Sequence, residues 1–175
     1  MYILSVVSFL LLGGFLLLAA MRFGVPAMVS DVYYQLQNCT GSEIIGDKRK
    51  RNYGWVFTAV IVTCAVLMMV CMLDTSKGVQ CLAFIGCMGL MFVGFAPNYL
   101  DADAYPIHKG GAIVAAAGCV GWCMSVCWVP TAVIALIYLL LVSCSDDDEG
   151  YKPVWYMAEV AGFLDVFLTY WVAYW

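Results

Sequence analysis

The chain has 175 residues, of which 65% are hydrophobic and only 11% are charged, and its mean hydropathy is +0.92. Soluble domains usually carry about 25% charged residues. A single soluble core cannot bury this much apolar surface, so the surrounding solvent must be lipid. The formal net charge of −4 also excludes the basic face that a nucleic-acid partner requires. Composition therefore predicts an integral membrane protein without a nucleic-acid partner.

The first apolar run covers residues 2–20 and is uncharged. Its length is close to the ~20 residues that a spanning helix needs. A cleaved signal peptide would begin with basic residues and soon reach a small-residue cleavage site. Neither Lys nor Arg precedes this run, so we expect a transmembrane helix rather than a signal peptide.

A polar segment follows at residues 21–52 and contains the basic cluster Lys48–Arg51. Its first part, residues 25–36, is expected to form an interfacial helix after Pro26, with Ser30 at the N-cap. Lys and Arg concentrate in the cytoplasmic loops of membrane proteins. We therefore place the loop 21–52 on the cytoplasmic side.

Two more apolar runs, at residues 53–73 and 79–96, predict the second and third helices. Tyr53 and Trp55 open the second helix, where aromatic residues commonly mark the membrane interface. Pro97 ends the third helix, because proline lacks the amide hydrogen that a helix interior needs.

Residues 110–144 form an uncharged segment of 35 residues. One straight helix of this length would run ~50 Å, whereas the hydrocarbon core is ~30 Å thick. We therefore divide the segment into helices at 110–127 and 131–144, with a turn at 128–130. The second piece is short for a span, so a single crossing, and hence five helices in all, stays an alternative. Residues 153–175 form the last predicted helix.

The eight basic residues indicate how the helices are oriented. With six spans, all of them except Lys77 lie on one side, whereas with five spans Lys152 changes sides. The positive-inside rule therefore favours six helices, with both termini outside the cytoplasm and residues 94–111 at the cytoplasmic face. The predicted fold is all-α, a polytopic bundle of six transmembrane helices that forms one domain over residues 1–175.

Eight of the nine cysteines lie inside apolar runs or at their ends, where cysteine mostly acts as a small apolar residue. No Cys-x-x-Cys pair occurs, and one histidine cannot complete the usual mixed zinc site. We expect neither a metal nor a cofactor. Small residues recur every four positions along 110–127, and this stripe lets another helix approach closely, in the same chain or in a homo-oligomer. The stripe consists of Gly111, Ala115, Cys119, Cys123 and Cys127.

Residues 94–111 contain the only histidine, His108, together with Asp101 and Asp103. A helix start disfavours a cation, so we expect a neutral imidazole. Beside carboxylates, such an imidazole can act as acid, base or ligand. The alternative is an interfacial histidine that uses a hydrogen bond to hold the hairpin formed by residues 94–111. The predicted ligand-binding residues at this face are Ser30, Asp31, Tyr34 and His108.

Two acids lie within the last helix. Counted from Pro153, Glu159 lies ~9 Å and Asp165 ~18 Å into the span. A charged carboxylate near mid-membrane costs ~3 kcal/mol or more. Asp165 is therefore expected either to be protonated and bonded to a hydroxyl or carbonyl, or to be a functional acid in a cavity.

The motifs SDVYYQL, GWVFTAVIV and GFAP followed by YPIHKGGAI resemble uncharacterised six-helix bacterial membrane proteins related to the Frag/DRAM-like families. Those proteins share a Phe-Pro-type break, an Ile-His pair and a following Gly-Ala. The matching residues here are Phe95, Pro97, Ile107, His108, Gly111 and Ala112. The resemblance implies a six-helix bundle in a bacterial inner membrane and no assigned reaction. Zinc-dependent intramembrane hydrolases also use a Ser-Asp pair, but a single histidine cannot supply their metal ligands.

The absence of a recognisable catalytic set favours a non-enzymatic role. We expect a small membrane protein that binds a lipid or small amphiphile, or acts through membrane partners, with the hairpin as its polar site. One alternative is a lipid head-group enzyme with His108 as general base, assisted by Asp101 or Asp103. Another is a proton- or cation-coupled transporter or oligomeric channel that uses Asp165 and Glu159.

Overall fold

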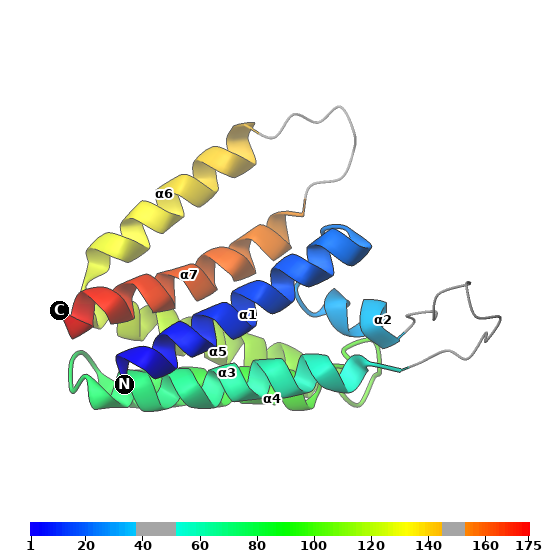
Figure 1. Ribbon diagram of the computed structural model, residues 1–175, viewed down its shortest axis with the longest axis horizontal. Coiled ribbons are helices and arrows are strands. Elements are labelled where there is room, and N and C mark those ends of the chain that lie inside the picture. Colours follow the sequence, from blue (N-terminus) through cyan, green and yellow to red (C-terminus); the bar gives the residue numbers. More distant parts are fainter. Residues whose placement is uncertain (38–51, 145–152) are drawn as a thin grey trace.

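The computed structural model describes residues 1–37, 52–144 and 153–175, and within these ranges all regular secondary structure is helical (Figure 1). The basic cluster Lys48–Arg51 and the four consecutive acids Asp146–Glu149 lie outside the described residues. In chain order the helices are α1 (Tyr2–Phe23), α2 (Asp31–Gln37), α3 (Gly54–Asp74), α4 (Gln80–Phe95), α5 (Tyr105–Val126), α6 (Trp128–Cys144) and α7 (Val154–Tyr174).

The ends of the first and fourth helices follow from local backbone chemistry. Helix α1 stops at Gly24, whose φ of 83° lies in the left-handed region that glycine adopts without steric cost. Helix α4 stops at Ala96, because a residue before proline is disfavoured in the helical conformation and Pro97 follows.

The uncharged segment 110–144 differs from the sequence expectation in two places. Helix α5 starts at Tyr105 rather than at residue 110, with Pro106 in its first turn. The break lies at the single residue Cys127, whose φ and ψ of −158° and 116° are extended, rather than at residues 128–130. Pro130 lies in the first turn of α6, where a missing amide hydrogen breaks no intrahelical hydrogen bond.

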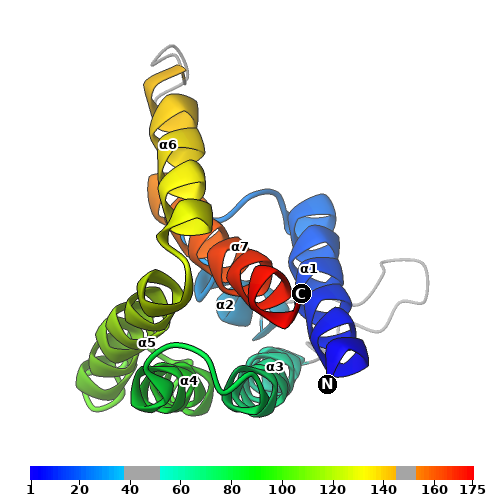
Figure 2. The same ribbon diagram turned by 90° about the vertical axis from the view of Figure 1, so that its left-hand side faces the viewer.

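Helices α3, α4 and α5 lie side by side in one layer, with α4 in the middle (Figure 2). Helices α1 and α7 cover one face of this layer, and α6 contacts α5 and α7 near its start and then diverges from the bundle. None of the side chains described in α6 is buried. The two chain termini lie at one end of the bundle, and α2 lies at the other (Figure 1).

Glycines bring the backbones of α4 and α5 into direct contact. A Cβ atom built on Gly89 would lie 2.5 Å from the backbone nitrogen of Ala115, and one on Gly86 would lie 2.6 Å from that of Cys119. The small-residue stripe of α5 is therefore occupied by α4 within the chain, at Gly111, Ala115 and Cys119. A homo-oligomer through the same face would require α4 to move.

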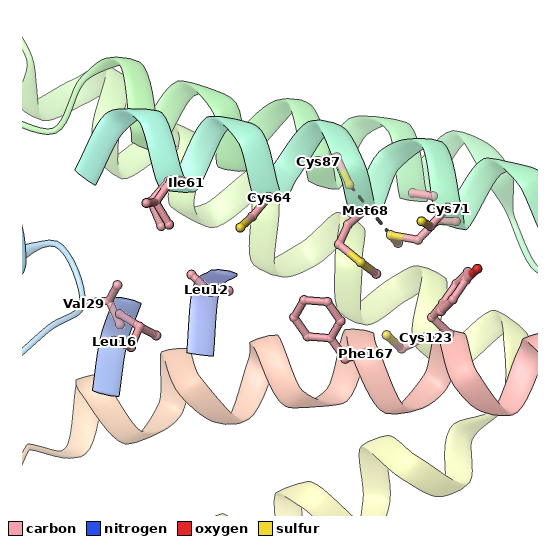
Figure 3. Close-up of a cluster of buried hydrophobic side chains, with 14 of the residues drawn as sticks. Leu12, Leu16, Val29, Ile61, Cys64, Met68, Cys71, Cys87, Cys123 and Phe167 are labelled. Atoms are coloured by element: carbon pink, nitrogen blue, oxygen red, sulfur yellow. Dashed lines mark hydrogen bonds between the residues drawn. The ribbon is translucent and has the colours of Figure 1, made fainter. Parts of the chain in front are cut away.

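Side chains from α1, α3 and α7 fill the space between the layer and its cover (Figure 3). Leu12 and Leu16 of α1 lie opposite Ile61 and Met68 of α3, and Phe167 projects from α7. Because these contacts join three helices that are distant in sequence, they hold α1 and α7 onto the layer.

Three of the described helices, α1, α3 and α5, are long and apolar enough to cross a membrane. Helices α4 and α6 are also apolar but have 16 and 17 residues, which corresponds to ~24–26 Å of helix. Helix α7 has 21 residues and contains Glu159 and Asp165. The all-helical fold and its three long apolar helices fit a membrane protein.

Candidate functional site

A group of polar side chains lies where the start of α2, the connection between α4 and α5, and the N-terminal parts of α5 and α7 meet. We call this group the polar cluster. Its members are Ser30, Asp31, Tyr34, Asn98, Tyr99, His108 and Glu159. It lies at the end of the bundle opposite the chain termini.

His108 links two other segments of the chain. Its Nδ1 lies 2.8 Å from the carbonyl oxygen of Ala96, and its Nε2 lies 2.9 Å from Oγ of Ser30. A carbonyl oxygen only accepts hydrogen bonds, so Nδ1 carries a hydrogen and donates it to Ala96. In a neutral ring, Nε2 then presents a lone pair to the Ser30 hydroxyl. The contact with Ala96 therefore selects the Nδ1–H tautomer of the neutral ring. Ser30 and His108 are only 6% and 8% exposed.

The chain reaches this geometry through the helix start at α5. The backbone amide of His108 donates to the carbonyl of Ala104, 2.9 Å away, which places the histidine in the first turn. Pro106 fits the same turn because helix starts do not need its missing amide hydrogen. The side chain of His108 then faces the bundle, whereas its neighbours Ile107 and Lys109 are exposed.

Asp31 ties the start of α2 to the α4–α5 connection. Its Oδ1 accepts a hydrogen bond from the hydroxyl of Tyr99, and its Oδ2 accepts one from the amide of Met28, 3.0 Å away. Burial raises the pKa of Tyr99 above its ordinary value, and the Asp31 carboxylate raises it further. Tyr99 therefore stays a neutral donor to Asp31.

Tyr34 makes a second link between α2 and the same connection. Its hydroxyl donates to Oδ1 of Asn98 and accepts from the amide of Leu100, both at 2.8 Å. The Tyr99 ring packs between the rings of Tyr34 and His108, with centroid distances of 5.3 and 5.4 Å. The structure thus brings together the four residues predicted as ligand-binding: Ser30, Asp31, Tyr34 and His108.

Asp101 and Asp103 lie outside this group. Both side chains are exposed, and Oδ1 of Asp101 accepts from the amide of Asp103, 3.1 Å away. Among the described residues, His108 makes its hydrogen bonds to Ser30 and Ala96 and to neither acid. The carbonyl of Ala96 therefore takes the orienting place that the sequence assigned to a carboxylate.

Glu159 belongs to the polar cluster rather than to the middle of α7. Its Oε2 accepts a hydrogen bond from the backbone amide of Val29, 2.5 Å away. The amide of Tyr156 also donates to the carbonyl of Ala27 at 2.9 Å. The loop at residues 24–30, which joins α1 to α2, is thus held against the start of α7.

Asp165 lies in the middle of α7 and is 3% exposed. The hydroxyl of Thr131 from α6 lies 3.0 and 2.9 Å from its two carboxyl oxygens, and that of Thr169 lies 3.3 Å from Oδ1. Hydroxyl partners are one of the two environments expected for this acid. The two acids of α7 therefore lie in separate surroundings.

Sequence reasoning did not identify Ala96, Asn98 or Tyr99 as members of the polar cluster. Asn98 and Tyr99 lie within the Pro-broken segment that the sequence singled out, so their position was an available signal. Ala96 contributes its backbone carbonyl oxygen, and because every residue type has this group, the sequence could not indicate its role. Within the described ranges, no group of three or more His, Cys, Asp or Glu residues is placed to hold a metal ion.

The described surface has an apolar groove between α4 and α5, with a volume of about 500 Å³. Its lining comes from both helices: Phe84, Ile85, Met88, Gly89 and Phe92 of α4, and Pro106, Ile107, Gly110, Gly111 and Val114 of α5. The groove starts at the first turn of α5, the turn that carries His108 on its inner side.

Comparisons of the chain with protein-family models, with curated proteins and with solved structures find no match. The resemblance to the Frag/DRAM-like families therefore rests on the sequence motifs alone.

Proposed function

We propose that the protein is a multi-pass membrane protein that binds one lipid or small amphiphile, with the apolar tail in the groove between α4 and α5. The observation that carries this proposal is the groove itself. It is an open apolar hollow of about 500 Å³ on the described surface, so it would hold a hydrocarbon chain along one side.

Glycines create the space that the groove offers. Gly89 and Gly111 bring the two helices together at its floor, and a Cβ on Gly110 would meet no atom within 4 Å. Large side chains flank this floor, including Phe92 on α4 and Ile107 on α5. An extended hydrocarbon chain fits such a space because it needs apolar walls and no hydrogen-bond partner.

The position of the groove sets the orientation of its occupant. Pro106 lies at one end of the groove and directly follows the polar connection between α4 and α5. An amphiphile with its tail along the groove therefore places its head group at this connection, beside the polar cluster. The hydrocarbon core offers a hydrophilic head group no hydrogen-bond partners, so such a group lies at the membrane interface.

We further propose six spans, formed by α1 and by α3 through α7, in a bacterial inner membrane. An even number of spans brings both chain termini to the same side of the membrane. The structure supports this topology, because both termini lie at one end of the bundle and the rings of Tyr2 and Tyr174 are 5.7 Å apart. The positive-inside rule then places the loop 21–52 and the polar cluster at the cytoplasmic face.

The experiment that tests lipid binding fills the groove and measures the lipid that stays bound. Gly110→Leu adds a side chain where the structure has open space, whereas Gly162→Leu makes the same change at an open position of α7. Native mass spectrometry of the purified protein should find lipid adducts on the wild type and on Gly162→Leu, and none on Gly110→Leu. Equal adducts on all three proteins would exclude the groove as the binding site.

A further inference from the structure

We propose that Ser30 is a nucleophile, activated by His108, that accepts an acyl group from a carboxylic ester at the membrane interface. This activity goes beyond the binding of an amphiphile. It also differs from the enzyme hypothesis drawn from the sequence, in which His108 worked with Asp101 or Asp103.

The geometry supplies the three parts that an activated serine needs: a nucleophile, a base and a group that orients the base. Ser30 Oγ lies 2.9 Å from Nε2 of His108, and Nδ1 of the same ring lies 2.8 Å from the carbonyl oxygen of Ala96. In the neutral ring, the bond to the Ala96 carbonyl keeps the hydrogen on Nδ1, so Nε2 presents its lone pair to the serine hydroxyl. Three separate segments of the chain provide these parts: the loop 24–30, α5 and the end of α4.

Neighbouring contacts hold each part in place. Two bonds anchor the residues that flank Ser30: Glu159 accepts from the amide of Val29, and Asp31 accepts from the hydroxyl of Tyr99. The Tyr99 ring also packs against the imidazole, with 5.4 Å between centroids. A serine and a histidine that are both fixed in this way keep the distance that proton transfer requires.

The place of the pair in the fold indicates the class of substrate. His108 is the fourth residue of α5, ~5 Å from the helix start. In the proposed topology this end of the bundle lies at the membrane interface, between the head groups and the ~30 Å hydrocarbon core, where the ester groups of membrane lipids also lie. Ile107, the residue before His108, lines the groove proposed to hold an apolar tail.

The chemical step is a transfer of the acyl group to serine. Ser30 Oγ bonds to the ester carbonyl carbon while its proton moves to Nε2 of His108. The bond from that carbon to the alkoxy oxygen then breaks, and the departing alcohol takes the proton from Nε2. The products are an acylated Ser30, a free alcohol and a neutral His108, so no oxidant, reductant or metal takes part.

Burial determines what happens to the acylated serine. Ser30 and His108 are 6% and 8% exposed, so an ester reaches the pair only when the neighbouring segments move apart, and bulk water has little access once they close. Exclusion of water slows the hydrolysis of reactive intermediates. The acyl-serine should therefore persist long enough to be detected directly by mass.

The test uses the full chain in maltoside micelles, with p-nitrophenyl octanoate as the probe. We expect the wild type to release nitrophenolate in a burst of about one equivalent and to gain one octanoyl group, which peptide mapping places on Ser30. His108→Gln should slow this acylation by about 100-fold, the usual contribution of a general base. Ser143→Ala, which removes an exposed serine of α6, should leave it unchanged.

The peptide map of the wild type decides the question without any variant, because a folded protein with no octanoyl group on Ser30 overturns the proposal. Acylation of Ser30 at the same rate in a folded His108→Gln protein overturns the role of the base. Lipid adducts and the octanoyl group on Ser30 are separate mass readouts on the wild-type protein. Adducts without acylation of Ser30 would overturn this inference and leave lipid binding intact, and acylation without adducts would do the reverse.

Discussion

The hydroxyl of Ser30 and the Nε2 of His108 lie 2.9 Å apart although 78 positions separate them in the chain. This one contact joins the loop after α1 to the first turn of α5. Together with the bond from Nδ1 to Ala96, it makes the imidazole a bridge between three segments. The stability of the polar cluster should therefore depend strongly on this side chain.

Replacing His108 by alanine should destabilise the protein by about 2–3 kcal/mol. The change leaves the Ser30 hydroxyl and the Ala96 carbonyl without their partner, and an unsatisfied buried polar group costs about 1–3 kcal/mol. Thermal unfolding in micelles, followed by circular dichroism, measures the loss. Asp103→Ala is the control, since that side chain is exposed. Equal stability of the two variants would show that the bridge does not hold the cluster together.

Tyr99→Phe should lower the free energy of unfolding by about 1.5–3 kcal/mol, because it removes a hydrogen bond to the carboxylate of Asp31. Tyr105→Phe is the matched control, since the Tyr105 ring is exposed on α5. The same unfolding measurement compares the two variants, and a larger loss in Tyr105→Phe would contradict the assignment.

The contribution of Tyr99 should also have a defined pH dependence. Its pKa is raised above the unfolded value of 10 by burial and by Asp31. A raised folded pKa means that the stabilisation is fully present below pH ~10 and is lost as the pH rises through the folded pKa. The difference in stability between wild type and Tyr99→Phe should therefore stay constant from pH 7 to about pH 9. A decline of this difference within that window would show that Tyr99 ionises early.

Asp165→Asn should change the stability by less than about 1 kcal/mol, whereas Asp165→Leu should cost at least 2 kcal/mol. Asparagine resembles the neutral acid in shape and keeps an oxygen that accepts from Thr131 and Thr169. Leucine removes these acceptors and leaves two hydroxyls unpaired. Unfolding of both variants in micelles checks the order. A large loss in Asp165→Asn would mean that the negative charge itself is required.

Gly89→Ala should destabilise the protein by about 1–3 kcal/mol, the usual cost of overpacking. The added Cβ would lie 2.5 Å from the backbone nitrogen of Ala115, and a backbone atom cannot move aside like a side chain. Gly13→Ala is the control, because a Cβ there meets nothing within 4 Å. It should instead stabilise α1 by roughly 0.5–1 kcal/mol. Similar effects at both positions would contradict the close contact between α4 and α5.

The positions of most helices could be read from the sequence because the signal is local. Long apolar runs, Gly24 after the first helix and Pro97 after the fourth mark the ends of segments within a few residues. The break near residue 128 was expected from length alone, but its place was not. Pro130 pointed to a turn, yet a proline fits the first turn of a helix, and the extended residue is Cys127.

Grouping Ser30, Asp31, Tyr34 and His108 was also possible from the sequence, because all four lie at predicted helix ends on one side of the membrane. Their partners were not predictable. Asp101 and Asp103 lie near His108 in sequence, yet the chain turns them outward at the α4–α5 connection. A short separation in sequence does not determine which groups form hydrogen bonds with the imidazole of His108.

By itself, the sequence determined that this chain is helical, rich in apolar segments and suited to lipid, because these properties depend on composition and on runs of about twenty residues. Only the tertiary structure decided which polar groups pair. Val29 and Glu159 are 130 positions apart, and they meet because α7 begins at the end of the bundle where α1 stops. Such pairs depend on how whole helices pack, and the packing of helices is a property of the assembled chain.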